Sequence, residues 1–242
     1  MKLIVLVLVL VASPAFAQFA SEQDRREALQ HYRNGQEFMS AEQFDKAAEE
    51  YQKAIDKDRL LTLAHYGLGQ ANMSLKRFAS AVQAFTNCRE TFRTLHTLQE
   101  RDRVLVERQR DDEIRELRDS VRRIRSGQIK LGQSVADQIE KRIQDLERQR
   151  SSMGGPFQAP PEVSLALGSA YFRNGSMEDA EREWKAAVAV NSKLGEAHNN
   201  LAALYAMTGR KAEAEASVKA AEKAGYKVNP RLKEDIRRMS TD

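Results

Sequence analysis

The chain has 242 residues, of which 31% are charged and 7% are aromatic, and it contains five prolines. This composition is typical of a helix-rich soluble protein, and the single cysteine, Cys88, excludes an intramolecular disulfide. The formal net charge of +4 is too small to indicate nucleic-acid binding by itself.

The first residues have the organisation of an export signal. Lys2 supplies a minimal positive region, Leu3–Ala12 is an unbroken apolar run, and Ala15–Ala17 forms an A-x-A cleavage motif before Gln18. The run is shorter than the ~20 residues that span a bilayer, so cleavage is favoured over a membrane anchor. No cysteine follows to form a lipobox. We therefore expect a bacterial-type signal peptide over residues 1–17 and an exported protein, periplasmic or secreted, with no membrane span after cleavage.

Each of two regions contains one residue pattern twice, and the two copies are 34 residues apart. In residues 18–93, Gly35, Phe44, Ala47, Tyr51 and Ala54 return as Gly69, Phe78, Ala81, Phe85 and Cys88. In residues 161–227, Gly168, Tyr171, Gly175, Ala180, Trp184 and Ala187 are answered by Ala202, Tyr205, Gly209, Ala214, Val218 and Ala221. A fixed period of this length is typical of stacked repeats, because a single helical pair cannot bury its apolar face alone.

Each repeat is expected to contain two helices, A and B, with small residues where the two must touch. In repeat one, Ser21 and Asp24 are predicted to cap helix A, which runs to about Ser40. Helix B is then expected over residues 41–57. In repeat two the helices are expected over residues 62–75 and 78–89.

Residues 94–150 differ from the repeats because they are charge-dense and lack aromatic residues and proline. Ile114, Leu117, Val121 and Ile124 form a coiled-coil seam, and Ile139, Ile143 and Leu146 form a second stripe. The intervening Ser126-Gly127 reads as a helix stop. We therefore expect a long antiparallel helical hairpin between the two repeat pairs. One continuous helix through Gly127 is the alternative, at a cost of only ~1 kcal/mol per glycine.

The remaining elements follow the hairpin. Residues 151–160 are a Gly- and Pro-rich linker, and residues 161–227 are the second repeat pair, in which Ser176 and Asp179 are predicted to cap a helix B. Residues 228–242 are predicted to hold a short terminal helix, apolar on one side and charged on the other, as a capping helix should be.

These residues resemble the tetratricopeptide repeat family. The resemblance lies in Leu68-Gly69 and Leu167-Gly168 of helix A, in the spacing from Phe78 to Cys88 in helix B, and in Tyr171–Gly175 followed by Trp184. It implies an all-α solenoid of helix-turn-helix repeats, here interrupted by the charged hairpin. The proline that often closes such a repeat is replaced by Arg59, Arg93 and Ser192.

The sequence shows no recognisable catalytic, cofactor or metal constellation, so we expect a protein that is not an enzyme and uses no cofactor. His31, His65 and His198 occupy the same slot of three different repeats, which favours helix packing over a shared metal site. The acidic runs fit solvated helix faces better than paired catalytic acids.

The resemblance implies that helix A of each repeat lines the concave side, where protein or peptide partners bind. The residues that would then line the partner-binding side are Leu29, Tyr32, Arg33 and Gln36 in repeat one, Leu63, Tyr66 and Gln70 in repeat two, Glu162, Leu165, Ser169 and Arg173 in repeat three, and Glu196, Asn199, Asn200 and Ala203 in repeat four. Tyr32 and Tyr66 could be exposed and act as a hot spot for the partner. The alternative is that both side chains simply pack on the next helix.

A second candidate surface lies on the hairpin, where four arginines recur on one helical face: Arg115, Arg118, Arg122 and Arg125. They could receive an anionic lipid or glycan, or they could form salt bridges along the seam. Two functional hypotheses result. The first is a non-enzymatic exported scaffold that binds a partner protein through its repeats in the cell envelope, with possible self-association through the hairpin. The alternative is a surface-association protein that uses the Arg-rich hairpin.

Overall fold

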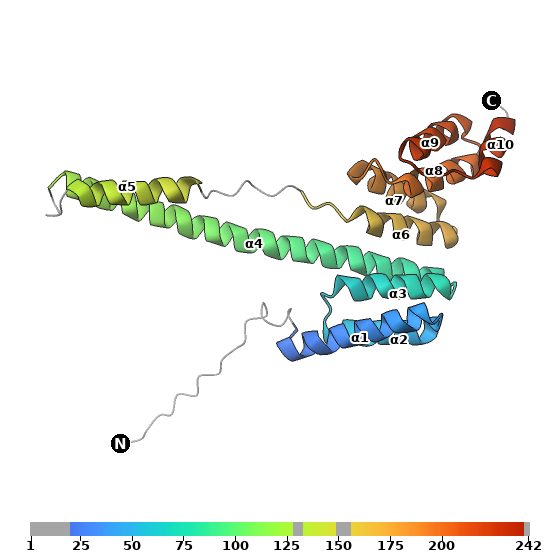
Figure 1. Cartoon of the computed structure of the whole chain (residues 1–242), viewed down its shortest axis with the longest axis horizontal. Coiled ribbons are helices and arrows are strands. Elements are labelled where there is room, and N and C mark those ends of the chain that lie inside the picture. The colour runs from blue at the N-terminus through green and yellow to red at the C-terminus, as the bar shows by residue number, and fades with distance from the viewer. Residues whose placement is uncertain (1–19, 128–132, 149–155, 240–242) are drawn as a thin grey trace, which may run out of the picture. The chain divides into compact units, whose positions relative to one another are not determined.

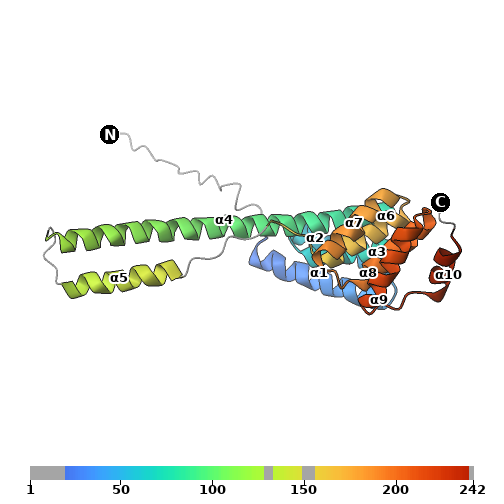
Figure 2. The same cartoon turned by 90° about the horizontal axis from the view of Figure 1, so that it is seen from above.

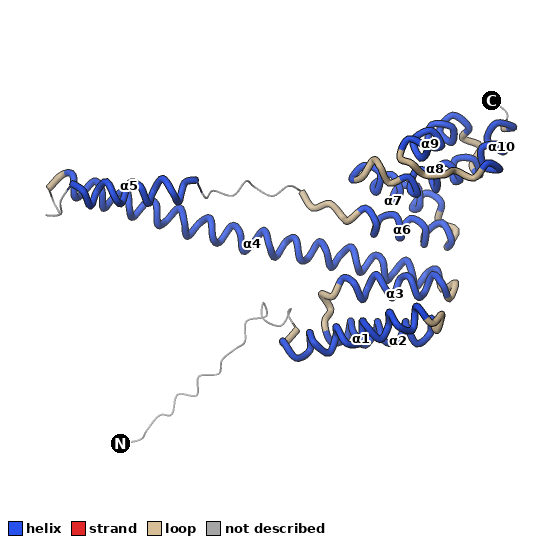
Figure 3. The backbone as a smooth tube through the Cα atoms, viewed as in Figure 1, coloured by secondary structure: helices blue, strands red, loops and turns tan. Residues whose placement is uncertain are grey.

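The structure is a computed structural model that describes residues 20–127, 133–148 and 156–239. The predicted signal peptide and residues 151–155 of the predicted linker lie outside the described residues. Within these residues every regular element is a helix (Figure 3). This confirms the predicted all-α class.

The chain divides into two units. The repeat unit contains residues up to 92 and from 158 onwards, and the hairpin unit contains residues 93–157. The helices, labelled in Figure 1, are α1 (Glu22–Ser40), α2 (Phe44–Lys57), α3 (Thr62–Ser74), α4 (Phe78–Arg125), α5 (Gln133–Arg148), α6 (Pro161–Arg173), α7 (Met177–Val190), α8 (Gly195–Met207), α9 (Lys211–Lys223) and α10 (Pro230–Arg238).

In repeats one to three, a glycine of helix A faces an aromatic ring of helix B. A Cβ atom built on Gly69 would lie 2.5 Å from the Phe85 ring, and one on Gly168 would lie 2.6 Å from Trp184. Gly35 stands in the same relation to Tyr51, at 2.6 Å. Real Cβ atoms do not approach a ring so closely, so the glycines allow the two helices to pack around a large buried side chain. The sequence pattern contains both the glycine and the aromatic residue, but it did not show that the two are in contact.

Repeats two and three share one core although the hairpin separates them in sequence. Ala81 and Phe85 of α4 pack with Leu167 and Ala170 of α6. Beside this core, Arg89 donates to Glu183 of α7 at 2.8 Å, and the Glu183 side chain is only 6% exposed. Breaking a buried pair of this kind leaves an uncompensated charge, so the pair helps to fix one repeat on the next.

The C-terminal repeats are joined by a second ion pair. Arg210, at the start of α9, donates to both carboxylate oxygens of Glu181 on α7, at 2.6 and 3.1 Å. The same guanidinium lies 4.2 Å from the centre of the Tyr205 ring. Helix α10 then closes this end, with Ile236 buried in the same core as Trp184 and Tyr205.

Within the hairpin unit, α5 lies alongside the distal part of α4 (Figure 2). The apolar stripes meet as the sequence suggested: Ile114, Val121 and Ile124 of α4 pack with Ala136, Ile143 and Leu146 of α5. Ion pairs run between the helices, from Arg118 to Glu147 and from Arg125 to Glu140. The partners descend in number along α5 as the arginines ascend along α4, so the pairing is antiparallel. Helix α4 ends just before Gly127, whose φ is +76°.

Two local predictions were wrong. Helix B of repeat two was expected to end near Arg89, but α4 continues to Arg125 because no glycine or proline interrupts residues 78–125. Ser176 stands at the N-cap of α7 but makes no side-chain cap hydrogen bond, and Asp179 instead pairs with Arg182 at 2.6 Å. The cap of α1 was correct, because Ser21 accepts from the backbone N–H of Asp24.

None of the helices that the structure describes combines the length and the apolar character that crossing a bilayer requires.

The glycine–ring contact makes a prediction about stability. Gly69→Ala should lower the free energy of unfolding by about 1–3 kcal/mol, because the new methyl group would overlap the Phe85 ring. Repeat four carries Ala202 and Val218 at the equivalent positions, so a second change, Phe85→Val, should restore part of the loss. Urea unfolding followed by circular dichroism measures both. Additive losses in the double variant would contradict the contact.

A second prediction concerns pH. Hydrogen bonds from Arg210 hold the pKa of Glu181 at about 2 against the opposing effect of burial, with Lys185 and Tyr205 also donating. The folded pKa lies below the ordinary value of 4.5, so this stabilisation is complete above about pH 5 and disappears as the pH falls towards about 2.

Glu181→Gln should therefore lower the free energy of unfolding at neutral pH by about 2 kcal/mol and make its fall on acidification shallower. Unfolding curves taken across that pH range would test this. The matched control is Glu215→Gln, which alters an exposed carboxylate on α9. Equal acid sensitivity of the Glu181 variant and the unmodified protein would be incompatible with the assignment.

Candidate functional site: the helix-A face

The predicted partner-binding residues lie on α1, α3, α6 and α8, which are the A helices of the four repeats. We call their shared surface the helix-A face. It is defined by the residues at the repeat positions of Leu29, Tyr32, Arg33 and Gln36. The structure places these residues in three different environments, which are described in turn.

The most exposed apolar residues of this face are Leu29 on α1 and Leu63 on α3. Their exposed fractions are 39% and 51%. They are 34 residues apart and therefore occupy the same position in consecutive repeats. Arg33, Gln36 and Gln70 are also exposed.

The two tyrosines both pack and remain partly accessible. The Tyr32 ring lies 5.8 Å from that of Tyr51, and the Tyr66 ring lies 5.4 Å from that of Phe85 in an edge-to-face arrangement. Gln36 donates to the Tyr32 hydroxyl at 2.9 Å. Each ring is thus held by the repeat interior on one side and is half-buried overall. Packing within the repeats accounts for these ring contacts, and part of each tyrosine remains exposed.

In repeat three, three of the predicted lining residues are engaged within the protein. Leu165 packs against the C-terminal core, and its carbonyl accepts from both Ser169 and the Trp184 indole. The Arg173 guanidinium lies 4.9 Å from the centre of the Phe78 ring on α4. These side chains serve repeat packing. Glu162 is exposed.

In repeat four, Glu196 is exposed, and Asn199, Asn200 and Ala203 are half-buried. Together with Glu162 they give this end of the helix-A face a polar and acidic surface. The repeat spacing located each of these residues. It did not show that this polar end of the face differs from the end that carries the leucines of repeats one and two.

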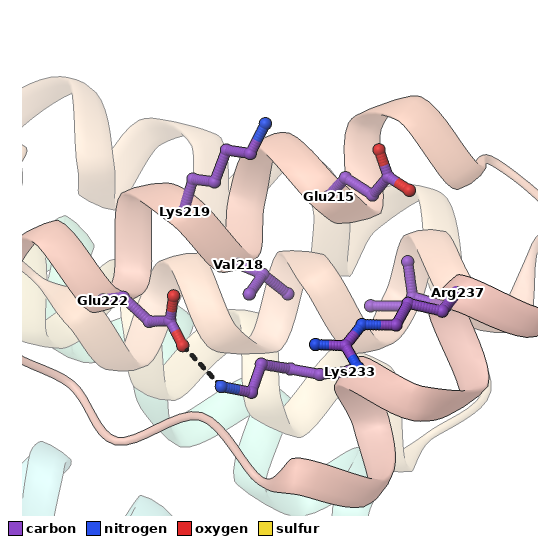
Figure 4. Close-up of a pocket in the computed structure, with 7 residues that line it drawn as sticks. Glu215, Val218, Lys219, Glu222, Lys233 and Arg237 are labelled. Carbon is purple, nitrogen blue, oxygen red and sulfur yellow. Dashed lines mark hydrogen bonds and ion pairs between the residues drawn. The ribbon is translucent and has the colours of Figure 1, made fainter.

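Surface depressions adjoin two parts of the repeat unit. One of about 610 Å³ adjoins α1 and is lined by Arg33, Gln36, Glu37, Ser40 and Ala41, which include two residues of the helix-A face. Another, of about 250 Å³, lies between α9 and α10, where Lys233 donates to Glu222 at 2.8 Å (Figure 4). Both signs of charge line this second depression, and its apolar floor includes Val218.

The four hairpin arginines are exposed, and the ion pairs of Arg118, Arg122 and Arg125 lie within the hairpin unit. Arg118 and Arg125 pair with Glu147 and Glu140 of α5, and Arg122 pairs with Asp119 at 3.5 Å. A depression of about 340 Å³ lies here and is lined by Asp111, Ile114, Arg115, Arg118, Arg122 and Glu147. The salt-bridge interpretation accounts for these three side chains. Binding of an anionic lipid or glycan and self-association through the hairpin stay predictions.

The repeated histidines hold loops in place. His65 donates through Nε2 to the carbonyl of Arg59 at 3.0 Å, and His198 does the same to Ser192 at 3.1 Å, because a carbonyl can only accept. Arg59 and Ser192 are the residues that replace the repeat-closing proline. In the first repeat, His31 instead contacts Glu50 at 2.8 Å. Across the described residues, no three His, Cys, Asp or Glu side chains are grouped in a way that could hold a metal ion.

Burial governs the titration of two interior groups. It raises the pKa of the Cys88 thiol to about 12, so this residue is a small buried side chain and not a reactive nucleophile. Burial also raises the pKa of Tyr66, and the carboxylates of Glu162 and Glu196 add to the rise.

Comparisons with known proteins agree with this geometry. The family model for the tetratricopeptide repeat matches residues 32–87 and 165–227. Two crystal structures of MamA match with a TM-score of 0.53 and 14% identity; one covers 84% of this chain and 81% of its own, and the other covers 87% and 79%. A thermophilic repeat protein of Thermus thermophilus, TTC0263, is 18% identical with a TM-score of 0.35, covering 87% of this chain and 97% of its own.

Comparison with curated proteins gave no match. At 14% identity the two MamA structures establish the fold alone. The matched segments coincide with the helix pairs described above, whose A helices carry the predicted partner-binding residues. The two matched segments are therefore tetratricopeptide repeats, and the fold of this chain is that of a tetratricopeptide repeat protein.

Proposed function

We propose that this protein is a non-enzymatic exported scaffold or adaptor that binds a partner protein through its helix-A face in the cell envelope. Proteins of the tetratricopeptide repeat family typically mediate protein–protein interactions. The observation that carries the proposal for this chain is the pair Leu29 and Leu63, which expose apolar surface at one position of consecutive repeats.

Several properties of this face suit recognition. The leucines lie one helical turn from Tyr32 and Tyr66, whose rings are already held on one side by the repeat interior. A side chain that is ordered before binding loses little conformational entropy when the partner arrives. Tyrosine is also enriched among residues that dominate binding energy.

Export is supported by the composition of the first 17 residues, which combine a cationic start, an apolar run and an A-x-A motif. The scaffold would then act in the periplasm or outside the cell.

The export step has a direct test. When the full chain is expressed in a bacterial host, we expect the exported protein to begin at Gln18, because cleavage follows Ala17. Intact-mass measurement of the periplasmic and culture fractions would show the loss of residues 1–17. Ala15→Asp should block processing, because the cleavage site requires small residues. Protein that retains Met1–Ala17 in all fractions would contradict export by this signal.

The binding step can be tested by site-specific photocrosslinking. A benzoylphenylalanine placed at Leu63 should form a covalent adduct with a partner protein in cells of the native host, because this side chain is half exposed on the proposed face. The matched control is the same group at Ala79, which is exposed on helix B of the same repeat. Adducts that form equally at the two positions, or at neither, would refute partner binding on this face.

A further inference from the structure

One position of helix A changes its chemistry halfway along the repeat unit. It lies six residues before the glycine or alanine that faces helix B. In repeats one and two it holds Leu29 and Leu63, and in repeats three and four it holds Glu162 and Glu196. All four side chains are exposed. The same structural position therefore presents apolar surface at one end of the face and negative charge at the other.

The two glutamates are not part of the internal ion-pair system. Two acidic side chains at the repeat interfaces, Glu181 and Glu183, each have a close cation. By contrast, neither Glu162 nor Glu196 has an ion-pair partner within the described residues. Their charges are therefore available to a ligand.

Tyr66 connects the two ends of the face. It belongs to α3, beside Leu63, and packs against the core shared with α6. Its hydroxyl senses the charges of Glu162 and Glu196, while burial is the main cause of its raised pKa. Glu162 lies in the first turn of α6, the helix whose Leu167 and Ala170 pack against Tyr66, and Glu196 lies in the first turn of α8, the A helix of the next repeat. An occupant that runs along the helix-A face from Leu63 therefore passes Tyr66 before it reaches the two carboxylates.

We propose that the helix-A face binds a segment of the partner protein in which apolar residues are followed by lysine or arginine. The apolar residues would lie on Leu29 and Leu63, and the cation would lie beside Tyr66 between Glu162 and Glu196. This inference rests on the proposed function and gives the partner its chemical character.

Charge complementarity supports a basic occupant and disfavours an acidic one. The chain as a whole carries a formal net charge of +4, so the acidic end of this face is a local departure from the overall sign. The arginines of the A helices do not offset it: Arg173 is stacked on Phe78, and the others, Arg25, Arg26 and Arg33, lie on α1, in repeat one. A cation beside Tyr66 also gains from the negative face of the ring.

Three short fluorescein-labelled peptides test the proposal by fluorescence anisotropy against the full chain. One alternates leucine with lysine, one alternates leucine with glutamate, and one alternates serine with lysine. We expect the first to bind most tightly, since it alone supplies both apolar and cationic groups. Its affinity should also fall as salt is raised, because exposed ion pairs are screened.

Variants assign the binding to the face. Replacing both carboxylates, Glu162→Gln with Glu196→Gln, should weaken the leucine–lysine peptide about three- to tenfold, as two exposed ion pairs would. Glu215→Gln, which alters an exposed carboxylate on α9, should leave its affinity unchanged. Circular dichroism would verify that the variants keep their helices. Equal binding of the glutamate peptide, or no effect of the double variant, would overturn the proposal.

The outcomes separate this inference from the proposed function. If Leu63 crosslinks to a partner in cells while the glutamate variants bind the peptide normally, the face is a binding site and the basic character of its ligand is wrong. If neither Leu63 crosslinking nor peptide binding occurs, the proposed function fails together with this inference.

Discussion

The fold depends on the contact between a glycine of helix A and an aromatic ring of helix B. In repeats one to three a Cβ atom at this glycine would overlap the ring, so the two helices approach more closely than any other residue would permit. The ring is then almost fully buried, and Phe85 is 1% exposed. Burying so large a side chain supplies much of the apolar area that holds a helical pair together. In the fourth repeat, Ala202 takes the place of the helix-A glycine and Val218 takes the place of the aromatic residue of helix B. A larger residue on helix A thus faces a smaller one on helix B.

The same contact determines what remains available for binding. In repeats one and two the ring of helix B fills the interior, and the tyrosine three residues before the glycine on helix A packs against it and is half-buried. The position three residues earlier then faces outwards. Leu29 and Leu63 are exposed for this geometric reason, and Glu162 and Glu196 occupy the equivalent positions. Recognition chemistry can therefore vary at this position at little cost to the core.

Much of the fold could be predicted because the residue pattern of each helix pair repeats at a fixed spacing. The 34-residue spacing, the small residues and the aromatic positions identified the helix pairs, and the apolar stripes identified the two arms of the hairpin. The period could not show contacts between residues that do not repeat. The pair Arg89 and Glu183 is 94 residues apart in sequence, and nothing in either local pattern marks it. The end of helix B in repeat two was also missed, because repeat spacing carries no information about a helix that simply continues.

The sequence predicted where the candidate site lies, but it predicted less well which of its side chains are available for binding. Spacing alone located the helix-A residues, but it could not decide that Leu165 and Arg173 would serve packing while Glu162 would have no ion-pair partner in the part of the chain that the structure describes. That distinction depends on neighbours supplied by other helices. The histidine slot was likewise assigned to packing, while the hydrogen bonds from His65 and His198 to loop carbonyls required the three-dimensional arrangement.

The shared core of repeats two and three has a consequence for how the chain folds. Contacts between the other neighbouring repeats link residues that are about one repeat length apart in sequence. The contact between Arg89 and Glu183 links residues that are 94 apart. Closing the longer loop costs about 1 kcal/mol more in chain entropy than closing one of about 34 residues. Early formation of the hairpin would shorten the effective separation. The two halves are therefore expected to become ordered separately, with the joining of repeats two and three as the late and slow event.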